Sequence, residues 1–200
     1  MLTSSSHFAF IGGRLALDFT NELGRSSNFS WDELLDFLLA AKIISAERSA
    51  QLLSLPDADP HSAGSLLVKA RRLHAAFRAG FAAALRSDVL PRGGVDAIND
   101  ILRITEGHDE LVSEGSKWHI EFVASENTLD WLLAAVARSG AEILVELPAA
   151  PLRICSNPGC GLFFYDTSRT HRRRWCSMAR CGNRHKVAAF SRRHAAGRSA

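Results

Sequence analysis

The sequence predicts an α+β protein with a mostly helical N-terminal domain containing short β-hairpins, residues 1–149, and a small C-terminal module, residues 151–200. Three observations support this prediction. Much of the first part repeats apolar residues every three or four positions, as amphipathic helices do. All four cysteines lie between residues 155 and 181, and charge is divided unevenly between the two parts. With 200 residues, 46% of them apolar, the chain can form one medium core and one small module.

The uneven charge separates a basic segment from an acidic one. Residues 151–200 contain eleven Lys or Arg and one acid, Asp166, whereas the first 150 residues contain thirteen Lys or Arg and twenty Asp or Glu. The net charges are therefore +10 and −7, which agree with +3 for the whole chain. Such asymmetry indicates a polyanion-binding surface joined to a globular part. The alternative is a solvated basic tail, which fits less well with cysteines that would fold these residues into a defined surface.

The N-terminal part begins with a predicted β-hairpin. Two apolar segments, His7–Ile11 and Arg14–Thr20, flank a glycine pair, which can adopt the positive φ values of a tight turn. Asp18 and Asn21 would then lie near the end of the second strand, where polar groups can line a ligand pocket. Because these residue types are also common in turns, a pocket at Asp18 and Asn21 is one of two interpretations.

Helical patterns dominate the following residues. Ser30 and Glu33 have capping-box spacing, so a helix should run from about Trp31 to Ala41, and Ser45 should begin another. The two prolines in 56–60 indicate a loop. The other expected elements are a helix over 66–85 with His74 on its polar edge, a helix over 95–104, a strand over 117–123 and a helix over 127–146.

This part shows no constellation of catalytic residues. It lacks a glycine-rich phosphate loop, a Gly-x-Ser-x-Gly motif and a His-Glu-x-x-His helix, and its histidines are isolated from one another. The first residues do not resemble a secretory signal, and no apolar run approaches the ~18 residues of a membrane span. We therefore expect a cytoplasmic protein that is not an enzyme and has no membrane partner.

The cysteines form two pairs of equal spacing. Cys155-Ser-Asn-Pro-Gly-Cys160 is followed, after a fifteen-residue insert, by Cys176-Ser-Met-Ala-Arg-Cys181. In a reducing compartment this arrangement favours a metal over disulfides, and four thiolates suit one tetrahedral Zn²⁺ ion. The ion would be structural, because four cysteines leave no open coordination position. An iron–sulfur cluster is the alternative, and metal analysis would separate the two.

The residues around the cysteines predict a treble-clef-like zinc finger. The turn-forming sequence between the first two cysteines predicts a knuckle, residues 162–175 a hairpin, and residues from about Met178 to His194 a helix. Metal binding should contribute much of the folding energy, because the apolar cluster is small. The helix should face the hairpin with its apolar stripe, and the expected members of the cluster are Phe163, Phe164, Trp175, Val187 and Phe190.

These motifs together resemble a known family. Cys-x4-Cys, Phe-Tyr-Asp-x-Ser-Arg, Arg-Arg-Trp-Cys-Ser-Met and Cys181-Gly-Asn-Arg184 are similar to the CGNR zinc finger, and Leu15-Ala-Leu-Asp-Phe-Thr-Asn21 resembles the opening of the ABATE domain that precedes it. Glu22 departs from the threonine expected after that opening. The resemblance implies a bacterial, stress-induced transcription regulator. It would have a sensor or assembly domain of the ABATE type over 1–149, with an unidentified small-molecule effector, and a DNA-binding CGNR finger over 151–200.

Basic residues of the finger are the candidate DNA contacts: Arg169, Arg172, Arg173, Arg174, Arg184, Lys186, Arg192 and Arg193. Neutralised phosphates would supply most of the affinity, and Arg184 or Arg192 could also reach guanine edges. Because a single finger buries little area, we further expect a homodimer formed through the helical domain. The alternatives are a finger that binds a protein partner and a finger that prefers RNA.

Overall fold

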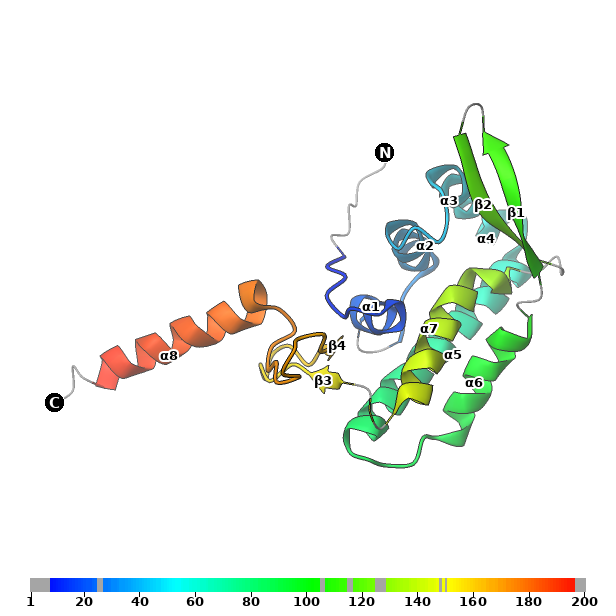
Figure 1. Ribbon diagram of the computed structural model, residues 1–200. Coiled ribbons are helices and arrows are strands. Elements are labelled where there is room, and N and C mark those ends of the chain that lie inside the picture. The colour runs from blue at the N-terminus through cyan, green and yellow to red at the C-terminus, as the bar shows by residue number, and fades with distance from the viewer. Residues whose placement is uncertain are drawn as a thin grey trace.

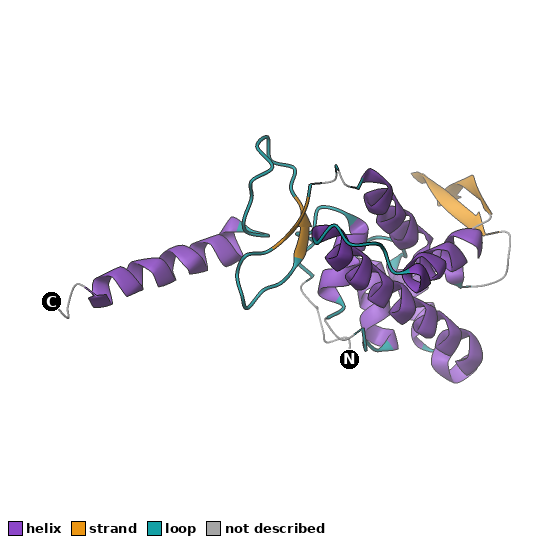
Figure 2. Ribbon diagram, turned by 90° about the horizontal axis from the view of Figure 1, so that it is seen from below, coloured by secondary structure: helices purple, strands orange, loops and turns teal. Residues whose placement is uncertain are grey.

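The computed structural model describes residues 8–24, 27–104, 107–114, 117–124, 129–147, 149 and 151–196. Helices form most of these residues, and two small antiparallel sheets accompany them (Figure 1). The last helix extends away from a compact helical body, as the second view also shows (Figure 2). The predicted α+β class is confirmed.

Two groups of elements follow one another along the chain. The body contains α1 (Leu15–Glu22), α2 (Trp31–Ala40), α3 (Ala46–Leu53), α4 (Leu55–Ala58), α5 (Pro60–Leu85), α6 (Arg92–Ile104), β1 (Gly107–Glu114), β2 (Lys117–Ala124), the 3-10 turn η1 (Asp130–Leu133) and α7 (Ala134–Glu146). The C-terminal elements are β3 (Leu152–Ile154), β4 (Phe163–Tyr165), the π-helical turn η2 (Met178–Gly182) and α8 (Asn183–Ala196). The strand expected over 117–123 is confirmed as one half of a hairpin, because β1 pairs with β2.

Helix α5 is the centre of the body, and α1, α2, α6 and α7 all pack against it. Its buried side repeats large apolar residues at helical spacing, including Leu66, Leu73, Phe77 and Phe81. The rings of Phe77 and Phe81 stack with their centroids 5.5 Å apart. Full burial of each such side chain stabilises the fold by about 1.5–3 kcal/mol.

Local sequence determines where α2 and α3 begin. The Ser30 hydroxyl accepts a hydrogen bond from the Glu33 amide, and the Glu33 carboxylate accepts one from the Ser30 amide. The hydroxyl of Ser45 caps α3 by accepting from the Arg48 amide. Both predicted helix starts are confirmed, and each cap stabilises its helix by about 1 kcal/mol.

The predicted N-terminal hairpin is wrong, because its second segment forms helix α1. Gly12 and Gly13 precede this helix instead of joining two strands. Within α1, Ala16, Leu17 and Phe19 are all fully buried. A helix that is buried almost all round carries no amphipathic period, so its apolar run cannot be told from a buried strand.

The loop predicted over residues 56–60 is also wrong. Pro56 lies in the first turn of α4, and Pro60 is the first residue of α5. Proline is favoured at these positions because the first amides of a helix have no intrahelical acceptor. The residues between the two prolines therefore end one helix and cap the next, with Asp59 accepting from the Ser62 amide.

His74 lies in the core and not on a polar edge. It is fully buried, with its Nε2 atom 3.1 Å from the Thr20 carbonyl oxygen and its Nδ1 atom 2.6 Å from the Ser27 hydroxyl. Burial lowers the pKa of His74 to about 4, so its imidazole is neutral at pH 7. Both ring nitrogens have partners, which explains how a polar side chain fits this apolar position.

Gly140 of α7 lies directly against the buried ring of Phe77 in α5. A Cβ atom at position 140 would lie 2.0 Å from Phe77 Cε1. We expect Gly140→Ala to lower the free energy of unfolding by about 1–3 kcal/mol, because the ring must move. Gly64→Ala in α5 is the matched control, since nothing lies within 4 Å of its Cβ, and should raise stability by about 0.5–1 kcal/mol. Urea unfolding measures both changes, and equal effects would contradict this packing.

Asp18 of α1 is a buried carboxyl whose pKa burial raises from 3.8 to about 6. The folded state binds this proton more tightly than the unfolded chain does. The protonated carboxyl therefore makes its whole contribution to the free energy of unfolding below pH 3.8, and this contribution is lost as the pH rises through 6. Asp18→Asn keeps an oxygen that can accept from the Gly12 amide. The measured quantity is the unfolding free energy of the variant minus that of the parent. We expect this difference to be about 1–3 kcal/mol more positive at pH 7.5 than at pH 4.5, because only the parent loses stability over this range. A pH-independent difference in urea unfolding would refute the shifted pKa.

Candidate metal centre and nucleic-acid interface

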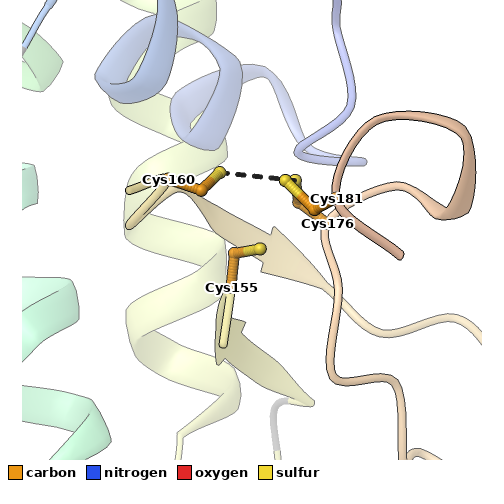
Figure 3. A group of neighbouring side chains, drawn as sticks. All are labelled: Cys155, Cys160, Cys176 and Cys181. Carbon is orange, nitrogen blue, oxygen red and sulfur yellow. Dashed lines mark hydrogen bonds between the residues drawn. The ribbon is translucent and has the colours of Figure 1, made fainter. Parts of the chain in front are cut away.

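The four cysteines converge on one point from two separate segments (Figure 3). Their Sγ atoms all lie within 4.8 Å of one another. The sulfur of Cys176 is 3.7 Å from that of Cys160 and 3.9 Å from that of Cys181. A disulfide would require about 2.05 Å, whereas tetrahedral zinc with Zn–S distances of about 2.3 Å sets its sulfurs about 3.8 Å apart. The four side chains therefore fit one zinc ion.

Three of these cysteines are buried and Cys160 is half-buried. Burial raises the pKa of the Cys176 thiol, so this sulfur holds its proton at neutral pH unless a cation displaces it. A zinc ion would bind the deprotonated sulfurs, and metal affinity would therefore fall as pH is lowered.

The first cysteine pair is positioned by a tight turn around Asn157. The amide of Cys160 donates to the Asn157 carbonyl oxygen at 2.8 Å, and the amide of Gly159 donates to its side-chain oxygen at 3.2 Å. The Asn157 side-chain nitrogen lies 3.5 Å from the sulfur of Cys181, in the second pair. The predicted knuckle is confirmed, and its asparagine also contacts the second half of the metal centre.

The hairpin predicted over 162–175 is wrong. Strand β4 pairs with β3, in the register Leu152 to Tyr165 and Ile154 to Phe163, so the knuckle lies inside the hairpin and not before it. The residues after β4 form turns instead of a strand. They fold around the Asp166 carboxylate. Hydrogen bonds from Ser168 and Arg173 to this carboxylate take the place of the strand pairing that was expected there.

Strand β4 joins two separate apolar cores. Phe163 lies in the core of the body, with its ring 5.8 Å from that of Phe81. The next residue, Phe164, is fully buried among the cysteines. Successive side chains of a strand point to opposite faces, which places one phenylalanine in each core. The helical body and the metal centre thus both pack on β4.

The apolar stripe of α8 is not part of either core. Val187 is 65% exposed and Phe190 is 56% exposed, whereas Trp175 packs beside the cysteines. The predicted packing of Val187 and Phe190 on the hairpin is therefore wrong. The body covers one face of β4 and the cysteines cover the other, so this strand offers α8 no free face. The helix instead extends outward (Figures 1 and 2).

Asn21 attaches β4 to the body through both ends of its amide. Its nitrogen donates to the Phe163 carbonyl oxygen at 2.8 Å, and its oxygen accepts from the Phe163 amide at 3.0 Å. Asp18 contacts β4 indirectly, through Gly12. Its Oδ1 accepts a hydrogen bond from the Gly12 amide at 2.7 Å, and the Gly12 carbonyl oxygen accepts one from the Tyr165 amide. Both side chains hold internal contacts here, and the ligand pocket around them stays a prediction.

A charged contact also attaches β4 to the end of α7. The Tyr165 hydroxyl donates to the carboxylate of Glu146, at the end of α7. The guanidinium of Arg14 lies 3.0 Å from that carboxylate and 4.6 Å from the centre of the Tyr165 ring. Strand β4 is therefore attached to the body by three kinds of contact: the packing of Phe163, the bonds between its backbone and Asn21, and the contacts of Tyr165.

Asp166 is the acid of the C-terminal segment, and it is fully buried. It accepts hydrogen bonds from the Ser168 hydroxyl at 2.7 Å, the Ser168 amide at 3.1 Å and the Arg173 amide at 2.8 Å. Burial acts to raise its pKa, but these hydrogen bonds hold the pKa of the Asp166 carboxyl below its usual value. The carboxylate therefore makes its hydrogen bonds inside the turns that carry the arginines, and it stabilises their shape.

Most of the predicted DNA contacts with described side chains are exposed, namely Arg169, Arg172, Arg174, Arg184 and Lys186. Arg173 differs: it is half-buried, donates to the Cys176 carbonyl oxygen at 2.8 Å and lies 5.0 Å from the centre of the Phe164 ring. Arg192 and Arg193 belong to α8, but their side chains lie outside the described part of the structure.

Arg180 was not among the cations predicted from the sequence to contact DNA. This exposed arginine lines, with Arg184 and His185, a cleft of about 540 Å³ between the knuckle and the start of α8. Arg180 and Arg184 are four residues apart, a spacing that places two side chains on one face of a helix. That spacing could have identified Arg180 from the sequence.

The fold and the cysteine cluster together define a zinc-finger protein with a helical N-terminal domain. Residues 152–194 match the CGNR zinc finger, and residues 13–146 match the ABATE family, described as "Putative stress-induced transcription regulator". The chain belongs to the ABATE family and carries a CGNR zinc finger, for which zinc is the expected ion. Both families are of regulator or zinc-finger type and not enzymes.

A search of curated proteins found no match. Among the described residues, none of the helices combines the length and apolar character that a membrane crossing requires.

Metal loss should destabilise the whole chain, because β3 and β4 contribute Leu152 and Phe163 to the core of the body. We expect the parent to contain one zinc per chain and Cys176→Ser to contain little. The variant should melt about 10 °C lower, which corresponds to a loss of about 3–5 kcal/mol at this size. Metal analysis and circular dichroism measure these changes, with Ser156→Ala at an exposed neighbouring position as the control. Iron in the purified protein, or an unchanged Tm without metal, would contradict the prediction.

Proposed function

We propose that this transcription regulator binds duplex DNA through the finger of residues 151–200, folded around one structural zinc on Cys155, Cys160, Cys176 and Cys181. One observation carries the proposal. Asp166, the acid of this segment, is fully buried, so every charged side chain described as exposed on the finger is cationic. A surface of this kind attracts the phosphate backbone without local repulsion.

Apart from Arg153 of β3, the exposed lysine and arginines described on the finger form two groups. Arg169, Arg172 and Arg174 come from the turns shaped by Asp166, whereas Arg180, Arg184 and Lys186 come from η2 and α8. We assign the first group to phosphate contacts. Helix α8 has 14 residues, spans about 21 Å and projects from the body, so it can enter a major groove about 12 Å wide. In this arrangement Arg184 or Arg192 would reach base edges, and Arg193 the backbone.

Arg173 has a different role in this proposal. Its guanidinium donates to the Cys176 carbonyl oxygen and covers the Phe164 ring, so it supports the metal centre more than it offers charge to a ligand. Replacing it would disturb the fold of the finger as well as its charge. Variants that test DNA binding should therefore leave Arg173 in place.

We propose that residues 1–149 sense an effector or assemble the protein in the cytoplasm, and that a homodimer forms through them. The contacts of β4 with α1, α5 and α7 support such a role, because they connect the body directly with the finger. Two fingers on one dimer would offset the small area that a single module buries.

The exposed stripe of α8 gives a second candidate function its support. Val187 and Phe190 lie three residues apart on a cationic helix and have no apolar cover in the described structure. A helix with this pattern could dock on an acidic protein partner. That binding would require the particular partner and would tolerate competitor DNA, which separates it from the main proposal.

The test is fluorescence anisotropy of the zinc-loaded full-length protein on random duplex DNA across a salt series. We expect the affinity to fall steeply with salt. Replacing Arg169, Arg172 and Arg174, the cations assigned to phosphates, by Gln should reduce the slope of log affinity against log salt by about 2–3, because each phosphate contact contributes about 0.9.

The matched control replaces Arg48, Arg86 and Arg103, which are exposed arginines of the body, by Gln. It removes the same charge from the other part of the protein and should leave the slope unchanged. An absence of binding at low salt, with zinc confirmed, would refute the DNA proposal. Stronger competition by structured RNA than by duplex DNA would redirect it to RNA.

A further inference from the structure

A second cavity lies at the junction between the body and the finger, away from the metal centre. Its volume is about 600 Å³, within the range of about 300–1,000 Å³ that small-molecule sites occupy. Its walls come from the end of α5 and the residues after it, the end of α7, and β3. Elements from both parts of the protein therefore form this cavity.

The lining of the cavity is divided about evenly between apolar and polar surface. Ala84, Leu144, Leu147 and Leu152 supply apolar surface from three different elements. Leu152 also belongs to the body core, so this wall is fixed by packing. A lining with separate apolar and polar parts suits a ligand that has an apolar body and one polar end.

Two charged residues line the polar side, and they are not equivalent. The carboxylate of Asp88 lies 2.7 Å from the Arg86 Nε atom, so it already has a cationic partner. Arg153 of β3 is exposed and has no acidic partner among the described residues. Its guanidinium donates one hydrogen bond to the His171 carbonyl oxygen, which leaves further N–H donors available. The polar side of the cavity is therefore suited to an anion.

We propose that this junction cavity binds a small amphipathic anion, with an apolar body against Leu144, Leu147 and Leu152 and a carboxylate or sulfonate on Arg153. The site is separate from the pocket predicted around Asp18 and Asn21. It is also independent of DNA binding, and it would exist if the finger had another partner.

Arg153 connects the cavity with the turns that carry the arginines. Its guanidinium lies 2.5 Å from the His171 carbonyl oxygen, and the His171 ring lies 2.7 Å from the Asp166 carbonyl oxygen. An anion at Arg153 would compete for, or reorient, the group that holds this segment. In a protein that binds DNA as proposed above, the cavity is thus placed to alter the DNA-binding surface.

The test uses the dye 8-anilinonaphthalene-1-sulfonate with the zinc-loaded full-length protein. The dye has an aromatic body and one sulfonate, and its fluorescence rises in an apolar site. We expect saturable binding that is weakened about tenfold by Arg153→Gln, because a charge-assisted hydrogen bond is lost. Ala84→Phe should fill the cavity and weaken binding at least as much. Arg103→Gln, at an exposed position of α6, is the matched control and should leave binding unchanged.

Competition separates the anionic group from the apolar body. Decanoate should displace the dye at a lower concentration than decanol does, and Arg153→Gln should remove this difference. Dye binding that survives both Arg153→Gln and Ala84→Phe would place the dye elsewhere and overturn the proposal. No saturable binding, or equal competition by decanoate and decanol, would also overturn it. Because DNA is absent, these outcomes are independent of the proposed DNA binding.

Discussion

The packing of Phe163 and Phe164 on opposite faces of β4 is the contact on which the rest of the structure depends. One ring completes the core around α5, and the next ring covers the cysteines. Because a strand alternates its side chains, three residues of backbone link the two cores, and Leu152 and Ile11 add further contacts between the two parts. The amide of Asn21 fixes the register, since it bonds both backbone groups of Phe163. We therefore expect metal binding and body stability to be coupled.

The charge of the finger depends on a second buried contact. An exposed carboxylate among the arginines would weaken any interaction with a polyanion, but Asp166 accepts three hydrogen bonds inside the turns. The acid thus shapes the cationic surface without opposing it. Arg173 has a similar internal position, since its guanidinium serves the metal centre. Net charge by itself does not distinguish such residues from those that face a ligand.

The junction between body and finger is a site as well as a support. Leu152 packs into the body, and its neighbour Arg153 contacts His171 in the segment that carries the arginines. Adjacent residues of one short strand thus face the body, the cavity and the finger. A ligand at this place would contact elements that are distant in sequence, as ligand sites between packed elements commonly do.

The sequence by itself determined what local chemistry controls: the capped starts of α2 and α3, the knuckle around Asn157, and the cysteine spacing that leads to one metal centre. Tertiary structure decided the rest. Helix α1 has no amphipathic period because it is buried nearly all round, and the partner of β4 is chosen by long-range packing. The exposure of Phe190 and the burial of Asp166 inside its own turns were likewise visible only in the folded chain. Local patterns define elements, but only the assembled fold assigns their faces.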